Sequence, residues 1–406
     1  MDLTFVITGT AVFTGVILTL VVLLSFISAL LSPGGKVTID INDGKKRLSV
    51  APGATLLSTL AEQSIYVPSA CGGGGTCAMC KCKVLEGGGS ILPTETGLVN
   101  KLEQRDGTRL SCQVKVRDNL KIEVPEEVLD VKKWECTVRS NRRVATFITE
   151  LVLDLPEDEN LDFRAGGYIQ IDIPTYKVNF SDFEIPKTFR DDWETMELFD
   201  LSAENDEETF RAYSMANHPA EGNRVMLNVR IATPPRGKNV PPGISSSYIF
   251  SLKPGDKAVV SGPYGEFFAK DTDREMVYVG GGAGMAPMRS HIFDLFQTQK
   301  TDRKVSFWYG ARSKREIFYE EDFQRIADAN NNFNFNIGLS EPMPEDNWDG
   351  YVGFIHQVLL NNYLDKHSDP TEIEYYLCGP PLMIAACKKT LHDLGVEPEM
   401  IAYDEF

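Results

Sequence analysis

Positive charge is scarce in this chain of 406 residues. Its 41 Lys and Arg stand against 58 Asp and Glu, a formal net charge of -17 at pH 7. Nucleic acids are bound through clustered Lys and Arg, so this balance argues against a nucleic-acid partner, and acidic partners are disfavoured for the same reason. We find no internal repeat and no low-complexity tract. With 42% hydrophobic and 24% charged residues, the chain can build more than one core, and we expect two or three domains.

Charge is missing altogether from one segment. Leu3 to Leu31 contains no Asp, Glu, Lys or Arg, and a helix needs only about 20 apolar residues to cross a bilayer. We therefore expect a transmembrane anchor within residues 1–35. A cleaved signal peptide is the alternative, but no basic residue precedes the segment, no clear cleavage motif follows it, and it is long for an apolar signal core.

The orientation of this anchor follows from the charges around it. The nearest basic residues all come after it: Lys36, Lys45, Lys46 and Arg47. The positive-inside bias therefore predicts that the rest of the protein lies in the cytoplasm. A single uncharged helix offers no path for an ion.

A small β-rich module is expected next, over residues 36–130. Alternating residues in Lys36–Ile41 and Lys45–Val50 predict a hairpin, and Leu56–Gln63 predicts a short helix. The alternation in Cys112–Val116 and Leu120–Val124 predicts two further strands.

Residues 131–270 have the pattern of an antiparallel β-barrel. Strands are predicted at Tyr168–Ile173, Val225–Ile231 and Lys257–Val260, with Gly and Pro turns between them. The acidic stretch Pro174–Phe210 has weak periodicity, and we interpret it as a surface insertion that is either solvated or a docking face.

Residues 271–406 change to an α/β pattern typical of nucleotide-binding domains. A buried strand at Met276–Val279 precedes a glycine turn and a helix at Pro287–Gln297, and further strands are predicted at Val305–Tyr309 and Tyr375–Cys378.

Four cysteines have the spacing of an iron-sulfur site. Cys71, Cys77 and Cys80 form C-x5-C-x2-C in a glycine-rich loop, and Cys112 follows downstream. The loop is poor geometry for disulfides, which predicts a reducing compartment, whereas four thiolates are what a 2Fe-2S cluster requires. Glycines let such a loop wrap closely and aim N–H groups at the sulfurs.

Other metal sites fit these cysteines less well. Structural zinc usually takes two tight Cys or His pairs, but only Cys77 and Cys80 form one. A Rieske centre needs two histidines, and none precedes His218. Cys82 falls outside the ligand spacing, and we interpret it, like Cys136 and Cys387, as a packing residue.

The loop spacing and the segment Arg109-Leu-Ser-Cys-Gln113 resemble a 2Fe-2S ferredoxin domain over Lys36 to Val124. The resemblance implies an α+β β-grasp fold. The spacing departs by one residue from the plant-type C-x4-C-x2-C.

The segment Arg211-Ala-Tyr-Ser214 resembles the Arg-x-Tyr-Ser motif of the ferredoxin-NADP reductase superfamily. The resemblance implies that Arg211 binds the FAD pyrophosphate, that Tyr213 packs on the flavin and that Ser214 approaches the flavin N5. A guanidinium suits phosphate because it donates two parallel hydrogen bonds. Further matches are Val229 and Arg230 in Leu227–Arg230, Gly243 and Ser246 at a glycine-led helix start, and the turn Gly262–Phe267.

A nicotinamide site is expected from two further motifs. Gly280, Gly281, Gly282 and Gly284 form a glycine turn between a buried strand and a helix, which suits a phosphate. Cys378, Gly379 and Pro380 resemble the superfamily's Cys-Gly-Pro motif, whose cysteine lies beside the hydride-transfer position. The resemblance also implies that the terminal Phe406 covers the flavin face. Relatives often carry a glutamate where this chain has Asp404, which leaves a proton-handling role open.

The choice between NADH and NADPH depends on Arg312, Ser313 and Lys314, which follow the second strand of this domain. These residues could bind a 2'-phosphate, but they also occur in relatives that use NADH. We expect NADH.

The order of anchor, ferredoxin module, flavin barrel and nucleotide domain resembles the family of NADH-oxidising subunits in bacterial Na+-translocating NADH-quinone oxidoreductases. The resemblance implies hydride transfer from NADH to FAD, single-electron transfer to a 2Fe-2S cluster, partner subunits of a membrane redox complex that reduces ubiquinone, and a place in the bacterial inner membrane. Alternatives are the reductase component of an oxygenase and a non-enzymatic redox-sensing module.

Overall fold

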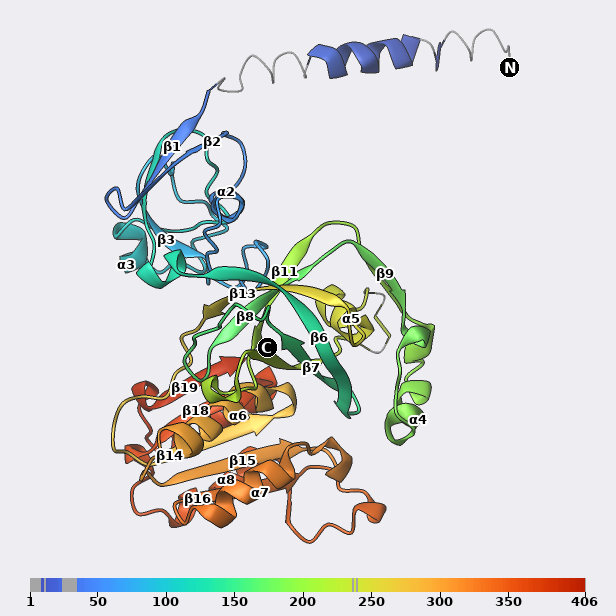
Figure 1. Cartoon of the computed structure of the whole chain (residues 1–406), viewed down its shortest axis with the longest axis vertical. Coiled ribbons are helices and arrows are strands. Elements are labelled where there is room, and N and C mark those ends of the chain that lie inside the picture. Colours follow the sequence, from blue (N-terminus) through green and yellow to red (C-terminus); the bar gives the residue numbers. More distant parts are fainter. Residues whose placement is uncertain (1–8, 11, 24–34, 236, 239, 406) are drawn as a thin grey trace. The chain divides into compact units, whose positions relative to one another are not determined.

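The computed structural model describes residues 9–10, 12–23, 35–235, 237–238 and 240–405. The chain forms two compact units (Figure 1). One unit contains the residues up to Val67 together with Gly73–Leu129, and the other contains Pro68–Gly72 and Asp130–Phe406.

The expected anchor is described only in part. Residues 9–10 and 12–23 are helical, and the large apolar side chains from Val12 to Leu23 are exposed. The remainder of Leu3 to Leu31 lies outside the described residues. Over the described ranges, no helix is both long enough and apolar enough to span a bilayer.

The first unit is a five-stranded mixed sheet with the strand order β2-β1-β5-β3-β4. The strands are β1 (Val37–Ile41), β2 (Lys46–Val50), β3 (Lys81–Glu86), β4 (Thr108–Leu110) and β5 (Leu120–Glu123), with the helices α2 (Leu56–Glu62) and α3 (Lys101–Arg105). The predicted hairpin is confirmed, because β1 pairs antiparallel with β2. The side chain of Thr55 caps α2 by accepting a hydrogen bond from the Ser58 N–H.

The strand predicted at Cys112–Val116 is wrong. These residues follow β4 as a turn, and their only ladder contact is an isolated bridge between Thr55 and Lys115. Val114 and Val116 alternate in the sequence because both are buried against the core. The period of two reflects this packing and a very short extended pairing, in which the Val116 N–H donates to the Ala54 carbonyl at 3.0 Å and the Val114 carbonyl accepts from the Leu56 N–H at 2.7 Å.

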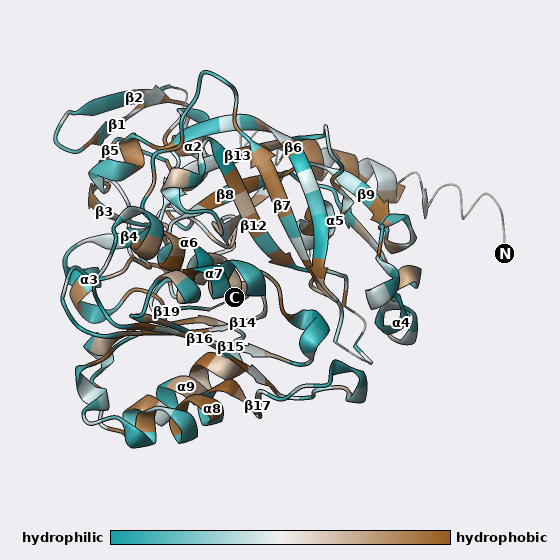
Figure 2. Cartoon of the chain, turned by 60° about the horizontal axis from the view of Figure 1, so that its bottom comes forward, coloured by the Kyte–Doolittle hydropathy of each residue, from teal (hydrophilic) through white to brown (hydrophobic). Residues whose placement is uncertain are grey.

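The predicted antiparallel barrel is present in the second unit. Its six strands have the order β11-β8-β13-β6-β7-β12, and a bridge between Met215, directly after β11, and Leu227 in the middle of β12 links the two edge strands. The strands are β6 (Lys132–Ala145), β7 (Ile148–Asp154), β8 (Tyr168–Ile173), β11 (Thr209–Ser214), β12 (Arg224–Arg230) and β13 (Lys257–Tyr264). In Figure 2, β7 is largely hydrophobic and β6 largely hydrophilic, which matches their buried and half-exposed patterns.

The acidic stretch Pro174–Phe210 is more ordered than its sequence indicates. It contains β9 (Tyr176–Asn179), α4 (Lys187–Thr195) and β10 (Ser202–Asn205), and β9 pairs antiparallel with β10. A separate apolar cluster holds it together, with Trp193 fully buried at its centre. Aromatic residues spaced irregularly along the chain build this core, so neither a helical nor a strand period in the sequence predicts it.

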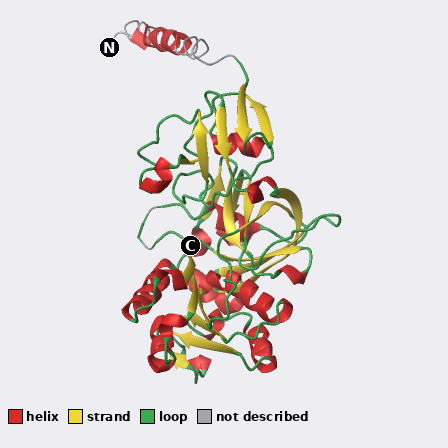
Figure 3. Cartoon of the chain, turned by 90° about the vertical axis from the view of Figure 1, so that its left-hand side faces the viewer, coloured by secondary structure: helices red, strands yellow, loops and turns green. Residues whose placement is uncertain are grey.

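The rest of the second unit is a parallel sheet covered by helices on both faces (Figure 3). Its six strands have the order β17-β16-β15-β14-β18-β19 and are all parallel. They are β14 (Met276–Gly281), β15 (Val305–Ala311), β16 (Phe333–Leu339), β17 (Tyr351–Val352), β18 (Glu374–Gly379) and β19 (Ile401–Glu405). The helices are α6 (Met285–Phe293), α7 (Glu320–Ala329), α8 (Ile355–Asn362) and α9 (Pro381–Asp393).

Alternate residues of these strands face different helices. Tyr278 and Phe307 pack with residues of α6 and α7, whereas Val277 and Val279 pack with residues of α8 and α9. Both faces are buried, so the strands are continuous apolar runs, as the sequence of β14 indicated. The predicted strands and the helix at α6 are confirmed.

A buried histidine on α6 makes stability depend on pH. The Nε2 of His291 lies 2.9 Å from the Phe267 carbonyl oxygen, and because a carbonyl only accepts, Nε2 carries the proton. Burial lowers the pKa of His291 from 6.5 to about 4, against the opposing effect of this hydrogen bond. Between pH 6.5 and about 4, His291 therefore binds a proton in the unfolded chain but not in the folded chain.

We expect the free energy of unfolding to fall by roughly 3 kcal/mol as the pH drops from 6.5 to about 4. His291→Gln keeps a donor for the carbonyl without the titration, so its melting temperature should fall less steeply over that interval. His392→Gln is the control, because the His392 side chain is 88% exposed. Parallel curves for wild type and His291→Gln would contradict the prediction.

Candidate functional site

The cysteine loop is built around backbone angles that favour glycine. Gly72, Gly73 and Gly75 all have positive φ, and a Cβ on Gly75 would lie 2.7 Å from the Gln113 Nε2. Cys80 precedes β3, and Cys112 lies in the turn after β4. Because β3 and β4 are paired, the fold brings together two cysteines that are far apart in the sequence.

The thiols of Cys80 and Cys112 are neighbours but form no disulfide. Contact with Cys112, together with burial, raises the pKa of Cys80. Two buried thiolates held side by side need a cation, which an iron cluster supplies. Within the described ranges, no three His, Cys, Asp or Glu side chains gather around a single point. A 2Fe-2S cluster does not require that arrangement, because it divides four thiolates between two irons.

β11 carries the residues predicted to hold the flavin, and all six of its residues are half-buried. Arg211 Nη1 donates to the Thr209 hydroxyl at 3.0 Å and to the Phe210 carbonyl at 2.7 Å. The Tyr213 hydroxyl donates to Ser245 Oγ at 2.9 Å, and burial raises the pKa of Tyr213 to about 12. Tyr213 therefore stays protonated, and Ser245, which the sequence did not single out, fixes its orientation.

The predicted helix start is present as α5 (Ile244–Ser251), with Gly243 as its N-cap. Ser246, however, uses its hydroxyl internally: it donates to the Gly243 carbonyl at 3.1 Å and accepts from the Ala232 N–H at 3.0 Å. Its hydroxyl therefore braces the loop. Val229 on β12 is buried in the barrel core and Arg230 is exposed. Of these two side chains, only that of Arg230 is open to a ligand.

The two glycine motifs of the nicotinamide site meet through their backbones. A Cβ on Gly284 would lie 2.1 Å from the Cys378 carbonyl oxygen, and one on Gly379 would lie 2.8 Å from the Gly281 carbonyl oxygen. Gly379 also has φ +149°. Any larger residue would force the carboxyl ends of β14 and β18 apart. The remaining predicted residues lie at the same end: Gly280 on β14, Gly282 in the turn and Pro380 before α9.

Three predicted catalytic residues come together from three strands. The Ser214 hydroxyl at the end of β11 donates to Asp404 Oδ2 on β19 at 3.0 Å. Asp404 is also the register partner of Cys378 on β18. Burial and then the negative charge of Asp404 raise the pKa of Cys378. The carboxylate is thus hydrogen-bonded to a hydroxyl and lies beside a neutral thiol, while the fourth predicted residue, Phe406, lies outside the described residues.

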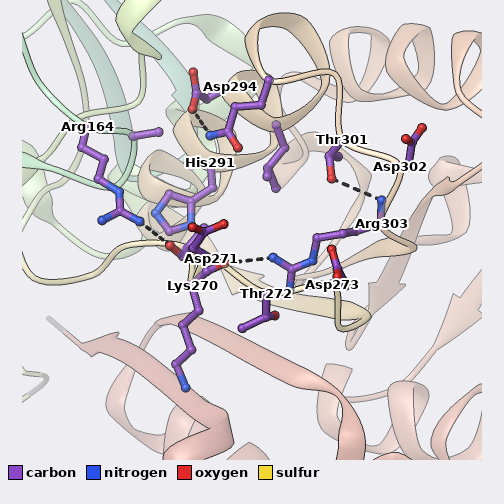
Figure 4. A pocket seen from close by; sticks show the side chains of 14 residues that line it. Arg164, Lys270, Asp271, Thr272, Asp273, His291, Asp294, Thr301, Asp302 and Arg303 are labelled. Atoms are coloured by element: carbon purple, nitrogen blue, oxygen red, sulfur yellow. Dashed lines mark hydrogen bonds between the residues drawn. The ribbon is translucent and has the colours of Figure 1, made fainter.

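A cavity of about 710 Å³ lies elsewhere in the second unit (Figure 4). Its lining residues include Arg164, His291 and Arg303, but none of the predicted flavin or nicotinamide residues. Arg164 donates to the Ala269 carbonyl, and Arg303 donates to two carbonyls and to Glu374. Because these cations are already used by the protein, we assign the cavity no ligand.

The sequence matches three family models. Residues 39–117 match the 2Fe-2S iron-sulfur cluster binding domain, residues 196–268 the oxidoreductase FAD-binding domain, and residues 278–389 the oxidoreductase NAD-binding domain. The sequence predicted FAD and a 2Fe-2S cluster as cofactors, with NADH as substrate, and the three family models confirm a binding domain for each.

The chain is also similar to curated proteins over nearly its whole length. It is 57% identical to the F subunit of the Na(+)-translocating NADH-quinone reductase of Histophilus somni over 98% of both chains. It is 55% identical to the protein of the same name from Serratia proteamaculans over 99% of both. Among solved structures, the Amycolatopsis cytochrome P450 reductase GcoB shares the fold, with a TM-score of 0.63 and 23% identity over 91% of this chain and 98% of that one.

Proposed function

The chain belongs to the family of F subunits of the Na(+)-translocating NADH-quinone reductase, and from this premise we propose that it is the electron-input subunit of such a complex. When bound, FAD supplies the chemistry that takes a hydride from NADH and releases electrons singly, and a 2Fe-2S cluster carries one electron at a time. The reductase component of an oxygenase has the same modules, but high identity over the full length favours the quinone reductase family.

The observation that carries this proposal is the meeting of Ser214, Asp404 and Cys378. The hydroxyl comes from the barrel, and the carboxylate and thiol come from the parallel sheet. A flavin held by β11 and a nicotinamide held by the glycine turns would meet beside these groups. Asp404 orients the Ser214 hydroxyl by accepting a hydrogen bond from it. Burial, and then the charge of Asp404, raise the pKa of Cys378 above its usual value. Their joint role is to position polar groups at the reacting ring atoms.

We assign the other predicted residues to the three bound groups. Arg211 would contact the FAD pyrophosphate, as would the N-terminus of α5 behind Gly243. Tyr213 would pack on the flavin ring, and Phe406 would cover the flavin face that the nicotinamide must occupy. The meeting glycines of β14 and β18 would let NADH approach the backbone. Cys71, Cys77, Cys80 and Cys112 would hold the cluster.

We further propose that Leu3 to Leu31 anchors the chain in the inner membrane and that the residues after this segment lie on the cytoplasmic side. The support is the uncharged sequence and the exposed apolar side chains of residues 12–23. Deleting residues 1–34 should release the protein from membranes without changing its flavin reduction by NADH. A truncated protein that still sediments with membranes free of partner subunits would contradict the anchor.

Anaerobic stopped-flow absorbance tests the electron path directly. Mixing the protein with NADH should bleach the flavin first and the cluster afterwards. Cys112→Ser should keep the flavin phase and lose the cluster phase, because one iron loses a thiolate. Cys387→Ser is the matched control, since Cys387 on α9 is buried in the apolar cluster that α8 and α9 form with the parallel sheet. Absence of a flavin phase in the wild type would contradict the proposed function.

We propose that residues after β15 favour NADH over NADPH. Arg312 follows β15, and its Nε lies 3.4 Å from Glu341 Oε2. Ser313 is buried, so it is not available to a 2'-phosphate as the sequence allowed. Glu341 both occupies Arg312 and repels a phosphate dianion.

We expect Glu341→Gln to raise kcat/KM for NADPH about tenfold, which is about 1.4 kcal/mol, with little change for NADH. Glu345→Gln, at an exposed carboxylate a few residues further on, is the control. Steady-state rates with both nucleotides decide the matter, and an unchanged NADPH rate would exclude Glu341 from specificity.

A further inference from the structure

Gln113 follows a cluster cysteine and contacts its sulfur. Its Nε2 donates to Cys112 Sγ at 3.6 Å, within the range of an N–H to sulfur hydrogen bond. The Thr94 hydroxyl donates to the Gln113 Oε1 at 3.1 Å. The oxygen end of the amide is thereby held toward Thr94, and the nitrogen end is held toward the sulfur.

The cysteine loop leaves room for this amide. Gly75, with φ +71°, lies so close that a Cβ there would be 2.7 Å from Nε2 and 3.3 Å from the amide carbon of Gln113. The backbone N–H of Gln113 donates to the Leu110 carbonyl at 2.8 Å, which fixes the start of the side chain. The amide is therefore held at both ends and packed against the loop that surrounds the cluster site.

An N–H donor on a cluster thiolate stabilises whichever redox state carries more negative charge. Reduction adds one electron to the cluster and breaks no bond, so the reduced state gains more from the donor than the oxidised state does. Hydrogen bonds to the sulfurs are one of the factors that set iron-sulfur potentials. A donor lost from Cys112 should therefore lower the potential.

We propose that Gln113, oriented by Thr94, raises the reduction potential of the 2Fe-2S cluster and so favours electron transfer from the flavin. The inference rests on the proposed function, because it requires the cluster on Cys112. Gln113 acts through the ligand sulfur, and it is neither a ligand nor a group that contacts NADH.

The test is a redox titration of the full-length protein, followed by the electron paramagnetic resonance signal of the reduced cluster. Gln113→Leu should shift the midpoint to a more negative potential. At a fixed ambient potential near the midpoint, the ratio of reduced to oxidised cluster should fall about tenfold, or about 59 mV for a one-electron couple. Thr94→Val keeps the amide but frees its orientation, so it should give a smaller shift in the same direction.

The matched control is Gln104→Leu. Gln104 lies at the end of α3 in the same unit, and its amide donates to the Val99 carbonyl at 2.6 Å, so this change loses a side-chain amide away from the cysteines. Gln104→Leu should leave the midpoint unchanged. A Gln113→Leu midpoint equal to that of wild type, or more positive, would overturn the proposal.

The outcomes separate this inference from the function beneath it. A wild-type protein without the cluster signal would refute the function itself. A normal signal with an unshifted midpoint in both Gln113→Leu and Thr94→Val would refute only the role of Gln113. Should Gln113→Leu assemble no cluster, Thr94→Val decides alone: a negative shift supports the proposal and an unchanged midpoint overturns it.

Discussion

Replacing Ser214 with alanine is expected to slow flavin reduction by NADH about 10²- to 10³-fold, the order of the cost of removing one preorganised polar group from a reacting centre. The Ser214 hydroxyl is held by Asp404 at 3.0 Å, so its direction is set before the nucleotide arrives. Alanine leaves no polar group there, and water cannot replace a hydroxyl oxygen whose position and orientation the protein has fixed. The measurement is the observed rate of flavin bleaching at saturating NADH under anaerobic conditions.

Two variants show whether this loss comes from the hydroxyl. Ser251→Ala removes a serine of the same unit whose hydroxyl donates to the Tyr248 carbonyl at 2.7 Å, and it should leave the rate unchanged. Asp404→Asn can still accept from Ser214 but lacks the charge, so we expect a smaller loss than in Ser214→Ala. If Ser214→Ala keeps its flavin and reduces it at the wild-type rate, the serine has no part in the reaction.

Replacing Arg289 with methionine is expected to destabilise the second unit by about 3–5 kcal/mol, the usual cost of stranding one partner of a buried ion pair. Arg289 on α6 donates through both terminal nitrogens to Glu221, at 2.7 and 2.6 Å, and also to the Ala216 carbonyl at 2.8 Å. Its guanidinium lies 4.2 Å from the centre of the Phe293 ring. The pair connects the helix behind the glycine turn to the loop before β12.

The pKa of Glu221 supports this estimate. Burial raises it, but the hydrogen bonds and charge of Arg289 outweigh burial, so the net pKa is below the usual 4.5. The stability from this pair is therefore present above pH 4.5 and is lost as the pH falls further. The difference between wild type and Arg289→Met should accordingly shrink in acid.

The effect is measured by thermal unfolding, monitored through the rise in fluorescence when the flavin is released. Arg325→Met is the control, because Arg325 also pairs with a carboxylate, Asp322, but its side chain is 75% exposed. An exposed pair contributes about 1 kcal/mol at most, so this variant should melt close to wild type. An Arg289→Met protein as stable as Arg325→Met would show that the buried pair is not needed.

Local patterns in the sequence were enough for the parts of the fold that depend on neighbouring residues. The hairpin of β1 and β2, the strands β8 and β12 and the helix α2 are where alternation and turn residues predicted them, and β14 is where a continuous apolar run predicted it. Alternation overpredicted a strand at Cys112–Val116, where two buried valines flank a single isolated bridge. Alternation predicted no element over Pro174–Phe210, because the core of this segment is built from aromatic residues at irregular intervals.

The sequence by itself indicated the cofactors of this protein: the spacing of Cys71, Cys77 and Cys80, the segment Arg211–Ser214 and the glycine turns each predict a local backbone shape and the group that it would bind. Only the tertiary structure decided which groups act together. Asp404 became the partner of Ser214 because the packing of the sheets sets that distance. The Gln113 amide is directed at the adjacent Cys112 because Thr94, 19 positions away, holds the amide oxygen. Contacts between residues 190 positions apart leave no trace in any local pattern, since they depend on how whole sheets pack.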